Sequence, residues 1–266
     1  MENINPTITQ HLADLTQQYD SRLLFAAESG SRAWGLPSPD SDYDVRFIYA
    51  HATHWYLSIE DRRETIETVF PDNIDLSGFE LRKALRMFSI CNISLNEQIQ
   101  SPVVYGGDPK FISRLTALIP VYFQKKRALF HYFKIAEQAF HQGMQGLSIG
   151  INRFFYVVRP LLACEWIEAY GTMPPTEFQK ILETDFLPLT LTNEIIDRIR
   201  QKAVSVDKEP IKLSKELVYW LTETLNRHQE TIQLYPNVTE SVSLKPLNEL
   251  FLDQIMVSSE IQQEDT

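Results

Sequence analysis

Two aspartates that follow a glycine-serine pair have the residue types and spacing of a site for phosphate chemistry with metal ions. Gly30-Ser31 is separated by ten residues from Asp42, and Asp44 follows two positions later. A glycine lets the backbone bend sharply and bring an amide close to a phosphate. Carboxylate oxygens suit hard divalent cations such as magnesium, which commonly bind one or two carboxylates together with substrate phosphates. These residues predict the handling of a nucleoside triphosphate with metal ions.

Strands must position these side chains. The apolar residues 23–27 predict a buried strand that ends at the glycine turn, and the two prolines after that turn exclude a continuing helix. A second strand is predicted over residues 42–49. Because alternate side chains of a strand share a face, Asp42 and Asp44 are expected to point the same way, and Arg46 is expected on that face too.

A third acid fits the same scheme. Asp75 lies between two apolar residues in a short extended segment that is able to pair beside residues 42–49. Asp72 and Glu80 are the neighbouring alternatives, and the apolar flanks favour Asp75. Three acids allow two metal ions, one activating the attacking hydroxyl and one holding the triphosphate and the leaving group.

The order of these motifs resembles a known signature. Gly30-Ser31, Asp42-Tyr43-Asp44-Val45 and Ile74-Asp75-Leu76 are similar to the pattern of the DNA polymerase beta-like nucleotidyltransferase superfamily. The surrounding residues resemble one bacterial branch more closely, the predicted nucleotidyltransferases of the RNA repair pathway DNA polymerase beta family. The segments that carry this closer resemblance are 28–35, 41–46, 75–85, 156–166 and 174–175, and it covers most of residues 20–185.

The resemblance implies an α+β fold, with a small polymerase-beta-like sheet and flanking helices followed by a mostly α-helical bundle. It implies transfer of a nucleoside monophosphate from an NTP to a hydroxyl, with release of pyrophosphate. Asp42 and Asp44 are expected to hold two Mg²⁺ or Mn²⁺ ions, and Asp75 the ion that activates the acceptor. The residues expected to contact the nucleotide are Gly30, Ser31, Arg32, Arg46, Lys83, Tyr156 and Arg159.

Three of these nucleotide contacts have an ordinary alternative. Lys83 lies in the first turn of the helix predicted after the third acid and reaches toward a triphosphate, or it is simply solvated. Arg153, Tyr156 and Arg159 are spaced to share a helical face that suits a base ring and a phosphate. In the alternative, Tyr156 packs in the bundle and the arginines pair with acids such as Glu165 or Glu168.

The charge balance limits how nucleic acid can bind. The 266 residues include 25 basic and 35 acidic side chains, and a net charge of −10 disfavours general attraction to nucleic acid. Residues 124–134 form a candidate local groove, because cations alternate there with aromatic rings that stack on bases. An amphipathic helix that buries Leu129, Phe130 and Phe133 is the favoured interpretation of the same segment.

The remaining sequence signals indicate a cytoplasmic protein without a membrane partner. No apolar run approaches the length of a membrane span, and the first residues lack the features of a signal peptide. Cys91 and Cys164 are too isolated for a disulfide framework and are expected to be buried thiols. His51 and His54 lack the further ligands that zinc requires.

Residues 101–110 are rich in glycine and proline and divide the chain into a part with strands and a part with helical periodicity. The predicted domains are a catalytic domain over 1–108, a helical domain over 109–257 and a disordered tail over 258–266. Ser94 opens a predicted capping box. Other helices are predicted over residues 2–19, 55–66, 81–88, 111–123, 126–142, 151–170, 176–182, 191–204, 212–230 and 246–256.

Three functions compete on these observations. The acceptor of the NTP-derived group is an RNA end, as the resemblance suggests, or a protein side chain that receives AMP. The third alternative is a non-catalytic nucleotide-binding module. Three clustered acids argue against a module, since clustered carboxylates cost stability. The acidic composition weakens the RNA hypothesis, and the size of the helical domain modestly weakens the protein hypothesis.

Overall fold

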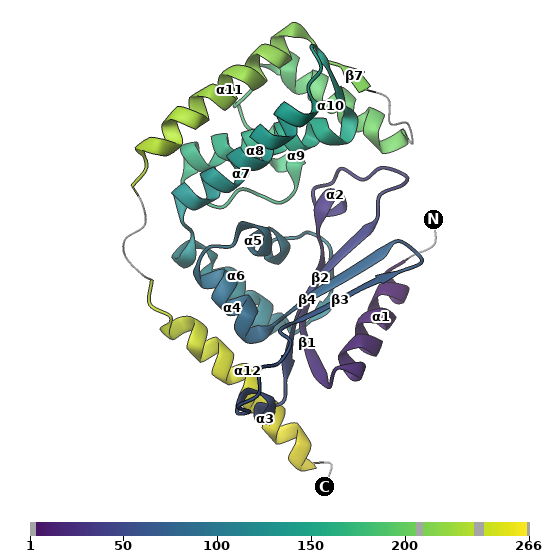
Figure 1. Cartoon of the computed structure of the whole chain (residues 1–266), viewed down its shortest axis with the longest axis vertical. Coiled ribbons are helices and arrows are strands. Elements are labelled where there is room, and N and C mark those ends of the chain that lie inside the picture. The colour runs from purple at the N-terminus through teal and green to yellow at the C-terminus, as the bar shows by residue number, and fades with distance from the viewer. Residues whose placement is uncertain (1–3, 206–209, 237–241, 265–266) are drawn as a thin grey trace. The chain divides into compact units, whose positions relative to one another are not determined.

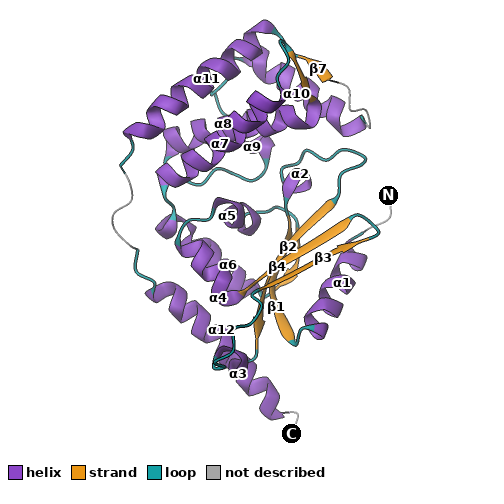
Figure 2. Ribbon diagram, in the orientation of Figure 1, coloured by secondary structure: helices purple, strands orange, loops and turns teal. Residues whose placement is uncertain are grey.

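A five-stranded sheet with helices on both faces forms the first part of the structure, a computed structural model that describes residues 4–205, 210–236 and 242–264 (Figures 1 and 2). The strand order is β3-β4-β2-β1-β5. The strands are β1 (Ser21–Glu28), β2 (Tyr43–His51), β3 (Thr65–Phe70), β4 (Ile74–Glu80) and β5 (Val104–Gly107). β2 and β4 are parallel, whereas the other pairs are antiparallel. The fold is therefore α+β, as predicted.

Side-chain alternation along β2 separates a core face from a polar face. Val45, Phe47 and Tyr49 are buried with Ile8 and Leu12 of α1 (Asn5–Gln18). The intervening residues point to the opposite face, because successive side chains of a strand alternate. Asp44 and Arg46 therefore lie on the face away from α1.

Helices of the first part confirm several predictions and correct two. α1 and α4 (Leu81–Ser89) lie where periodicity predicted them. The predicted helix over 55–66 is wrong, because α3 (Thr53–Tyr56) is short and β3 begins at Thr65. The predicted capping box at Ser94 is also misplaced, since the Asn92 side chain accepts the capping hydrogen bond of α5 (Ile93–Ile99) from the Leu95 amide at 3.0 Å.

The chain divides into two compact units whose bounds differ from the predicted domains. The sheet unit comprises the described residues of 1–33, 42–122 and 242–266, and the helical unit those of 34–41 and 123–241. α6 (Pro109–Tyr122) and α12 (Lys245–Glu264) belong to the sheet unit. α12 extends to Glu264 into the segment predicted as a tail, and residues 265–266 of that segment lie outside the described residues. Periodicity identifies a helix but not the element against which it packs, so the domain boundaries were not predictable in this way.

The helical unit is built around α8 (Ile151–Tyr170), whose Phe154, Val158 and Leu161 are completely buried. Its other helices are α7 (Lys125–Gly143), α9 (Phe178–Leu182), α10 (Leu189–Val204) and α11 (Lys215–Leu234), joined by a ribbon of β6 (Ser148–Gly150) and β7 (Pro210–Lys212). On α7, Leu129 and Phe133 are buried. This burial supports the amphipathic interpretation, although the Phe130 side chain is exposed. Within the described residues, the structure contains no helix that is both long and apolar enough to cross a membrane.

Candidate functional site

Asp44 and Asp75 are direct partners on the parallel strands β2 and β4. Parallel pairing with this register puts the two side chains on the same face of the sheet. The Arg46 guanidinium bridges them, with Nη2 at 3.3 Å from Asp44 Oδ1 and 2.9 Å from Asp75 Oδ2. The Asp44 and Asp75 side chains remain 36% and 35% exposed, so both carboxylates are accessible to a ligand.

The Asp44 carboxyl experiences opposing electrostatic influences. Partial burial raises its pKa above the usual range of an aspartate, the Arg46 guanidinium lowers it, and the Asp75 and Asp42 carboxylates raise it again. A divalent cation would relieve both the repulsion and the cost of burial. The pair is thus a place where bound positive charge is favourable, and Arg46 supplies it in this structure.

Asp42 lies immediately before β2 and is exposed, so the predicted strand begins one residue too early. Its charge nevertheless acts on Asp44. The Asp42 carbonyl oxygen accepts a hydrogen bond from Arg32 Nε at 3.0 Å, and the Arg32 Cζ lies 3.8 Å from the centre of the Tyr43 ring. The structure therefore brings Arg32, Asp42 and Asp44 together at the start of β2.

Gly30 is packed directly against the Asp44 carboxylate. It opens the short helix α2 (Gly30–Ala33) with φ +61°, a conformation that favours glycine. A Cβ atom at this position would lie 2.6 Å from Asp44 Oδ2. The Ser29 amide donates to the Asp44 carbonyl at 2.8 Å, which joins the glycine turn to β2. Ser31 follows on α2, so the predicted phosphate-binding pair begins at a residue packed against Asp44.

Glu28 is a supporting residue of the site that the sequence analysis missed. Its side chain is 1% exposed, its Oε1 accepts from the Asp44 amide at 2.9 Å, and its Oε2 accepts from the Tyr105 hydroxyl. Burial raises the pKa of the Glu28 carboxyl, while those two hydrogen bonds lower it. Glu28 thus holds the first residues of β2 in place. Its position directly before Ser29-Gly30 was the available signal, but its contact with Tyr105 depends on β5 reaching β1.

The Asp44 and Asp75 carboxylates offer oxygen donors to a cation, although among the described residues the three predicted acids do not form one compact ligand group. Asp44 and Asp75 face each other across one strand pair, Asp42 adds negative charge nearby, and a guanidinium already occupies the space between two of the carboxylates. Hard oxygen ligands in this arrangement are the donors that Mg²⁺ and Mn²⁺ bind.

The structure argues against a role for Lys83 at this site. Glu80 pairs with Tyr49 at the opposite end of β4 from Asp75. At about 3.3 Å per residue, the five intervening steps separate Asp75 from Glu80 by roughly 17 Å along the strand. Lys83 lies one turn beyond Glu80, with its Nζ 5.6 Å from the centre of the Phe79 ring. The strand that links the third acid to the helix is too long for the predicted contact.

Tyr156 and Arg159 lie in the helical unit with Trp34. The Tyr156 ring, 46% exposed, contacts the Trp34 ring edge-on at 5.3 Å between centres. Arg159 is only 2% exposed, its Cζ lies 4.4 Å from the centre of the Trp34 ring, and its Nη2 donates to the Thr176 carbonyl at 3.3 Å. This burial argues against direct contact between Arg159 and a nucleotide. Tyr156 remains available to a ligand.

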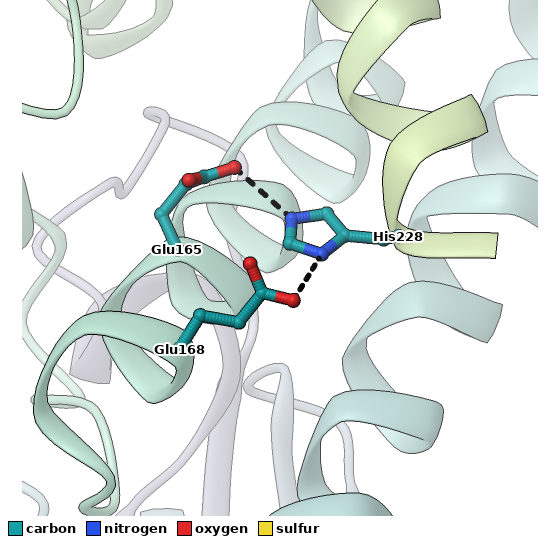
Figure 3. A group of neighbouring side chains, drawn as sticks. All are labelled: Glu165, Glu168 and His228. Carbon is teal, nitrogen blue, oxygen red and sulfur yellow. Dashed lines mark hydrogen bonds and ion pairs between the residues drawn. The ribbon is translucent and has the colours of Figure 1, made fainter. Parts of the chain in front are cut away.

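A second polar cluster, not predicted from the sequence, joins α8 to α11. Figure 3 shows the His228 ring between two glutamates, with Nε2 at 3.0 Å from Glu165 Oε1 and Nδ1 at 3.3 Å from Glu168 Oε1. Arg227 also pairs with both carboxylates. Two glutamates and a histidine are possible metal ligands. Here, however, each ring nitrogen faces a different carboxylate, which is the arrangement of an imidazolium in an ion-pair network.

Comparisons with known proteins show what this chain is similar to. Residues 4–253 match the family model described as RNA repair pathway DNA polymerase beta family. The chain is 43% identical over 175 residues to the "Uncharacterized protein YcgL" of Bacillus subtilis (strain 168), spanning 66% of this chain and 67% of that protein. A nucleotidyltransferase-like protein from Exiguobacterium sibiricum 255-15 covers 97% of this chain and 92% of its own, with 10% identity and a TM-score of 0.31, which is too low to bear on the fold.

Proposed function

This chain belongs to the RNA repair pathway DNA polymerase beta family, and we propose that it is a metal-dependent nucleotidyltransferase that modifies an RNA end. It moves a nucleoside monophosphate from an NTP to a terminal hydroxyl and releases pyrophosphate. The observation that carries this proposal is the Asp44–Asp75 pair on adjacent parallel strands, with Gly30 packed against one of its carboxylates.

In this proposal Asp42, Asp44 and Asp75 hold two Mg²⁺ or Mn²⁺ ions. Such ions, when bound, neutralise charge on the phosphates and lower the pKa of the attacking hydroxyl. The support is the donor set itself, since two facing carboxylates already attract one cationic side chain.

The chain's own residues divide the remaining work. We assign the triphosphate to Gly30 and Ser31, because the glycine turn lies against Asp44. Arg32 is anchored on the Asp42 carbonyl, in a position to balance phosphate charge. Arg46 neutralises the carboxylates before substrate binds and then offers its guanidinium to a phosphate.

The transfer is a single displacement at the α-phosphorus of the NTP. The acceptor oxygen forms a bond to phosphorus while the bond from phosphorus to the pyrophosphate oxygen breaks. The acceptor proton passes to the Asp75 carboxylate, which is accessible to a ligand on the polar face of the sheet.

The test uses the full chain with NTPs labelled at the α-phosphate, Mg²⁺ or Mn²⁺, and either RNA or protein from a lysate. We expect label on RNA that requires the metal. Asp75→Asn should reduce transfer at least a hundredfold, because loss of a residue that stabilises the transition state typically costs about 10²- to 10³-fold.

Asp72→Asn is the matched control, since Asp72 is an acid in the turn before β4 whose side chain faces His11 and not Arg46. It should retain full transfer. Label on protein alone would replace the RNA acceptor with a side chain that receives AMP. Bound nucleotide without turnover, or full activity of Asp75→Asn, would contradict the proposal.

A further inference from the structure

A pocket of about 440 Å³ opens on the helical unit, lined by residues of α7 and α8. Its polar lining consists of three amides, one arginine and one tyrosine, namely Gln138, Gln142, Asn152, Arg153 and Tyr156, and apolar side chains of α7 complete it. This volume falls in the range of small-ligand sites, about 300–1,000 Å³. A mixed apolar and amide lining suits a planar ring with a polar edge.

Two cations determine which way the amides face. Arg153 Nη1 donates to Gln142 Oε1 at 2.9 Å, and Lys202 Nζ donates to Asn152 Oδ1. Arginine and lysine only donate, so both amide oxygens must face the cations. The NH₂ groups of Gln142 and Asn152 are therefore the parts that remain for a ligand. The pocket consequently favours a ligand edge that is rich in hydrogen-bond acceptors.

The positions of the charged and aromatic groups in the pocket are set by packing. A Cβ atom on Gly143 would lie 2.2 Å from the Cδ of Arg153, so the absence of a side chain there lets Arg153 cross the end of α7. The Tyr156 ring is supported on one edge by Trp34 yet remains 46% exposed. An exposed, supported ring is a stacking surface for a base.

The charge of the lining distinguishes a strand from a free NTP. Arg153 is the one charged side chain among the residues that line the pocket. One guanidinium, already shared with Gln142, matches the single negative charge of a phosphodiester better than the several charges of a triphosphate.

We propose that this pocket binds one nucleotide of the single-stranded RNA acceptor, with its base on Tyr156, its backbone phosphate at Arg153 and its acceptor edge at the Gln142 and Asn152 amides. The proposal deepens the function proposed above and rests on it for the identity of the strand. A uracil edge carries two carbonyl acceptors, whereas adenine presents an amino donor toward amides that also donate. We therefore expect uridine to be preferred over adenosine.

The experiment measures anisotropy of fluorescein-labelled U₄ and A₄ RNA with the full chain, without NTP or metal. U₄ should bind about fivefold or more tightly than A₄. Tyr156→Ala should weaken U₄ binding roughly tenfold, because stacking on an aromatic ring is worth about 1–3 kcal/mol per base. Tyr156→Phe should bind like the wild type. The slope of the logarithm of the U₄ binding constant against the logarithm of the salt concentration should be about −0.7, the value for one phosphate contact on a single strand.

The most specific variant is Gln142→Glu, which keeps a partner for Arg153 but removes the NH₂ donor and adds a negative charge. We expect at least a tenfold loss of U₄ affinity. Gln179→Glu is the matched control, because Gln179 is an exposed residue of α9 that does not line the pocket and the charge change is the same. It should bind U₄ like the wild type.

Failure of this inference is distinguishable from failure of the proposed function. If the wild type labels RNA while Gln142→Glu binds U₄ as well as Gln179→Glu does, the pocket assignment is wrong and the transfer activity stands. If no RNA is labelled but Gln142→Glu still loses U₄ binding, the pocket assignment stands and the transfer activity is wrong. Equal affinity for U₄ and A₄, or loss of NTP binding alone in Gln142→Glu, would overturn the assignment.

Discussion

Asp44 is the residue whose position is most tightly determined at the candidate active site. Its backbone amide is held by Glu28 at 2.9 Å, its carboxylate by Arg46 at 3.3 Å, and its Oδ2 lies against Gly30. The Glu28 and Gly30 contacts come from the end of β1 and the turn that follows it, and the Arg46 contact comes from β2 itself. The Asp44 carboxylate is therefore presented in a fixed direction before any substrate or metal binds, which lowers the cost of assembling the site.

Replacement of Gly30 tests this placement. We predict that Gly30→Ala lowers transfer at least tenfold, because the new Cβ would displace Asp44 Oδ2 from 2.6 Å away. Gly35→Ala is the matched control, since Gly35 also has a positive φ, +75°, but a Cβ there meets no atom within 4 Å. Both variants should lose about 1–2 kcal/mol of stability from the left-handed backbone. Equal activity of the two variants would show that Gly30 does not position Asp44.

For single residues, the sequence pattern predicted that Asp44, Asp75 and Gly30 belong to one site, because side-chain alternation and apolar flanks are local properties of a strand. The bridging position of Arg46 and the support from Glu28 were not predictable. The position of Arg46 depends on the register between β2 and β4, and the contact of Glu28 with Tyr105 depends on the approach of β5 to β1. Both are contacts between segments distant in sequence.

The pairing of β2 with β4 is the element-scale feature that creates the acid pair, and Gly78 permits it to pack. Gly78 is the register partner of Phe47, whose ring lies where a Gly78 side chain would be. A Cβ on Gly78 would approach a ring carbon of Phe47 to 2.3 Å. The core beneath the site therefore requires a glycine at this position.

Gly78→Ala should destabilise the protein by about 1–3 kcal/mol, the usual cost of overpacking a core. The matched control is Gly106→Ala on β5, where the nearest atom to a new Cβ is Leu23 Cδ2 at an ordinary 3.6 Å. Chemical denaturation of both variants provides the measurement. A Gly78→Ala protein as stable as Gly106→Ala would contradict this account of the packing.

The network between α8 and α11 adds a pH-dependent term to stability. Burial lowers the pKa of His228, but its hydrogen bonds to Glu165 and Glu168 and their charges outweigh burial and raise the pKa overall. Arg227 pairs with the same two carboxylates. A pKa raised in the folded state gives stability that is fully present below the unfolded value, about 6.5 for histidine. That stability is lost as the pH rises through the folded pKa.

We predict that the wild type exceeds His228→Gln in free energy of unfolding by about 1–3 kcal/mol near pH 6, as expected for hydrogen bonds to charged groups. The difference should shrink toward pH 9. Denaturation between pH 5.5 and 9 measures it while avoiding the acid range. At acid pH a second group contributes. The His228 and Arg227 contacts outweigh burial and lower the pKa of Glu168, so protonation of Glu168 makes stability fall as the pH falls. A difference independent of pH would contradict the charged state of His228.

At the scale of the whole molecule, the C-terminal helix α12 belongs to the sheet unit, although it follows the helical unit in the sequence. Arg22 Nη2 donates to the Gln254 carbonyl at 2.9 Å, and the Thr53 hydroxyl donates to the Ile255 carbonyl at 2.6 Å. Leu250 is buried at 1% exposure. The sheet unit is therefore assembled from segments at both ends of the chain, and its stability depends on α12.

Two leucines of α12 that are two positions apart test this dependence. Leu250→Ala should cost about 2–5 kcal/mol of unfolding free energy, because it leaves a cavity in a packed core. Leu252→Ala removes the same atoms from a side chain that is 49% exposed, and should cost less than about 1 kcal/mol. Denaturation followed by intrinsic fluorescence compares the two. Equal effects would mean that α12 does not pack as an integral part of the sheet unit.

Local spacing and motifs were enough to identify the family, the α+β class and the positions of most helices, and they predicted the acids and the glycine turn of the candidate site. The tertiary structure alone decided the register that pairs Asp44 with Asp75, the separation of Lys83 from them, the burial of Arg159 and the return of α12. These features depend on which distant segments pack together. The free energy of burying one face against another selects that packing, and the period of a single helix or strand does not encode its partner.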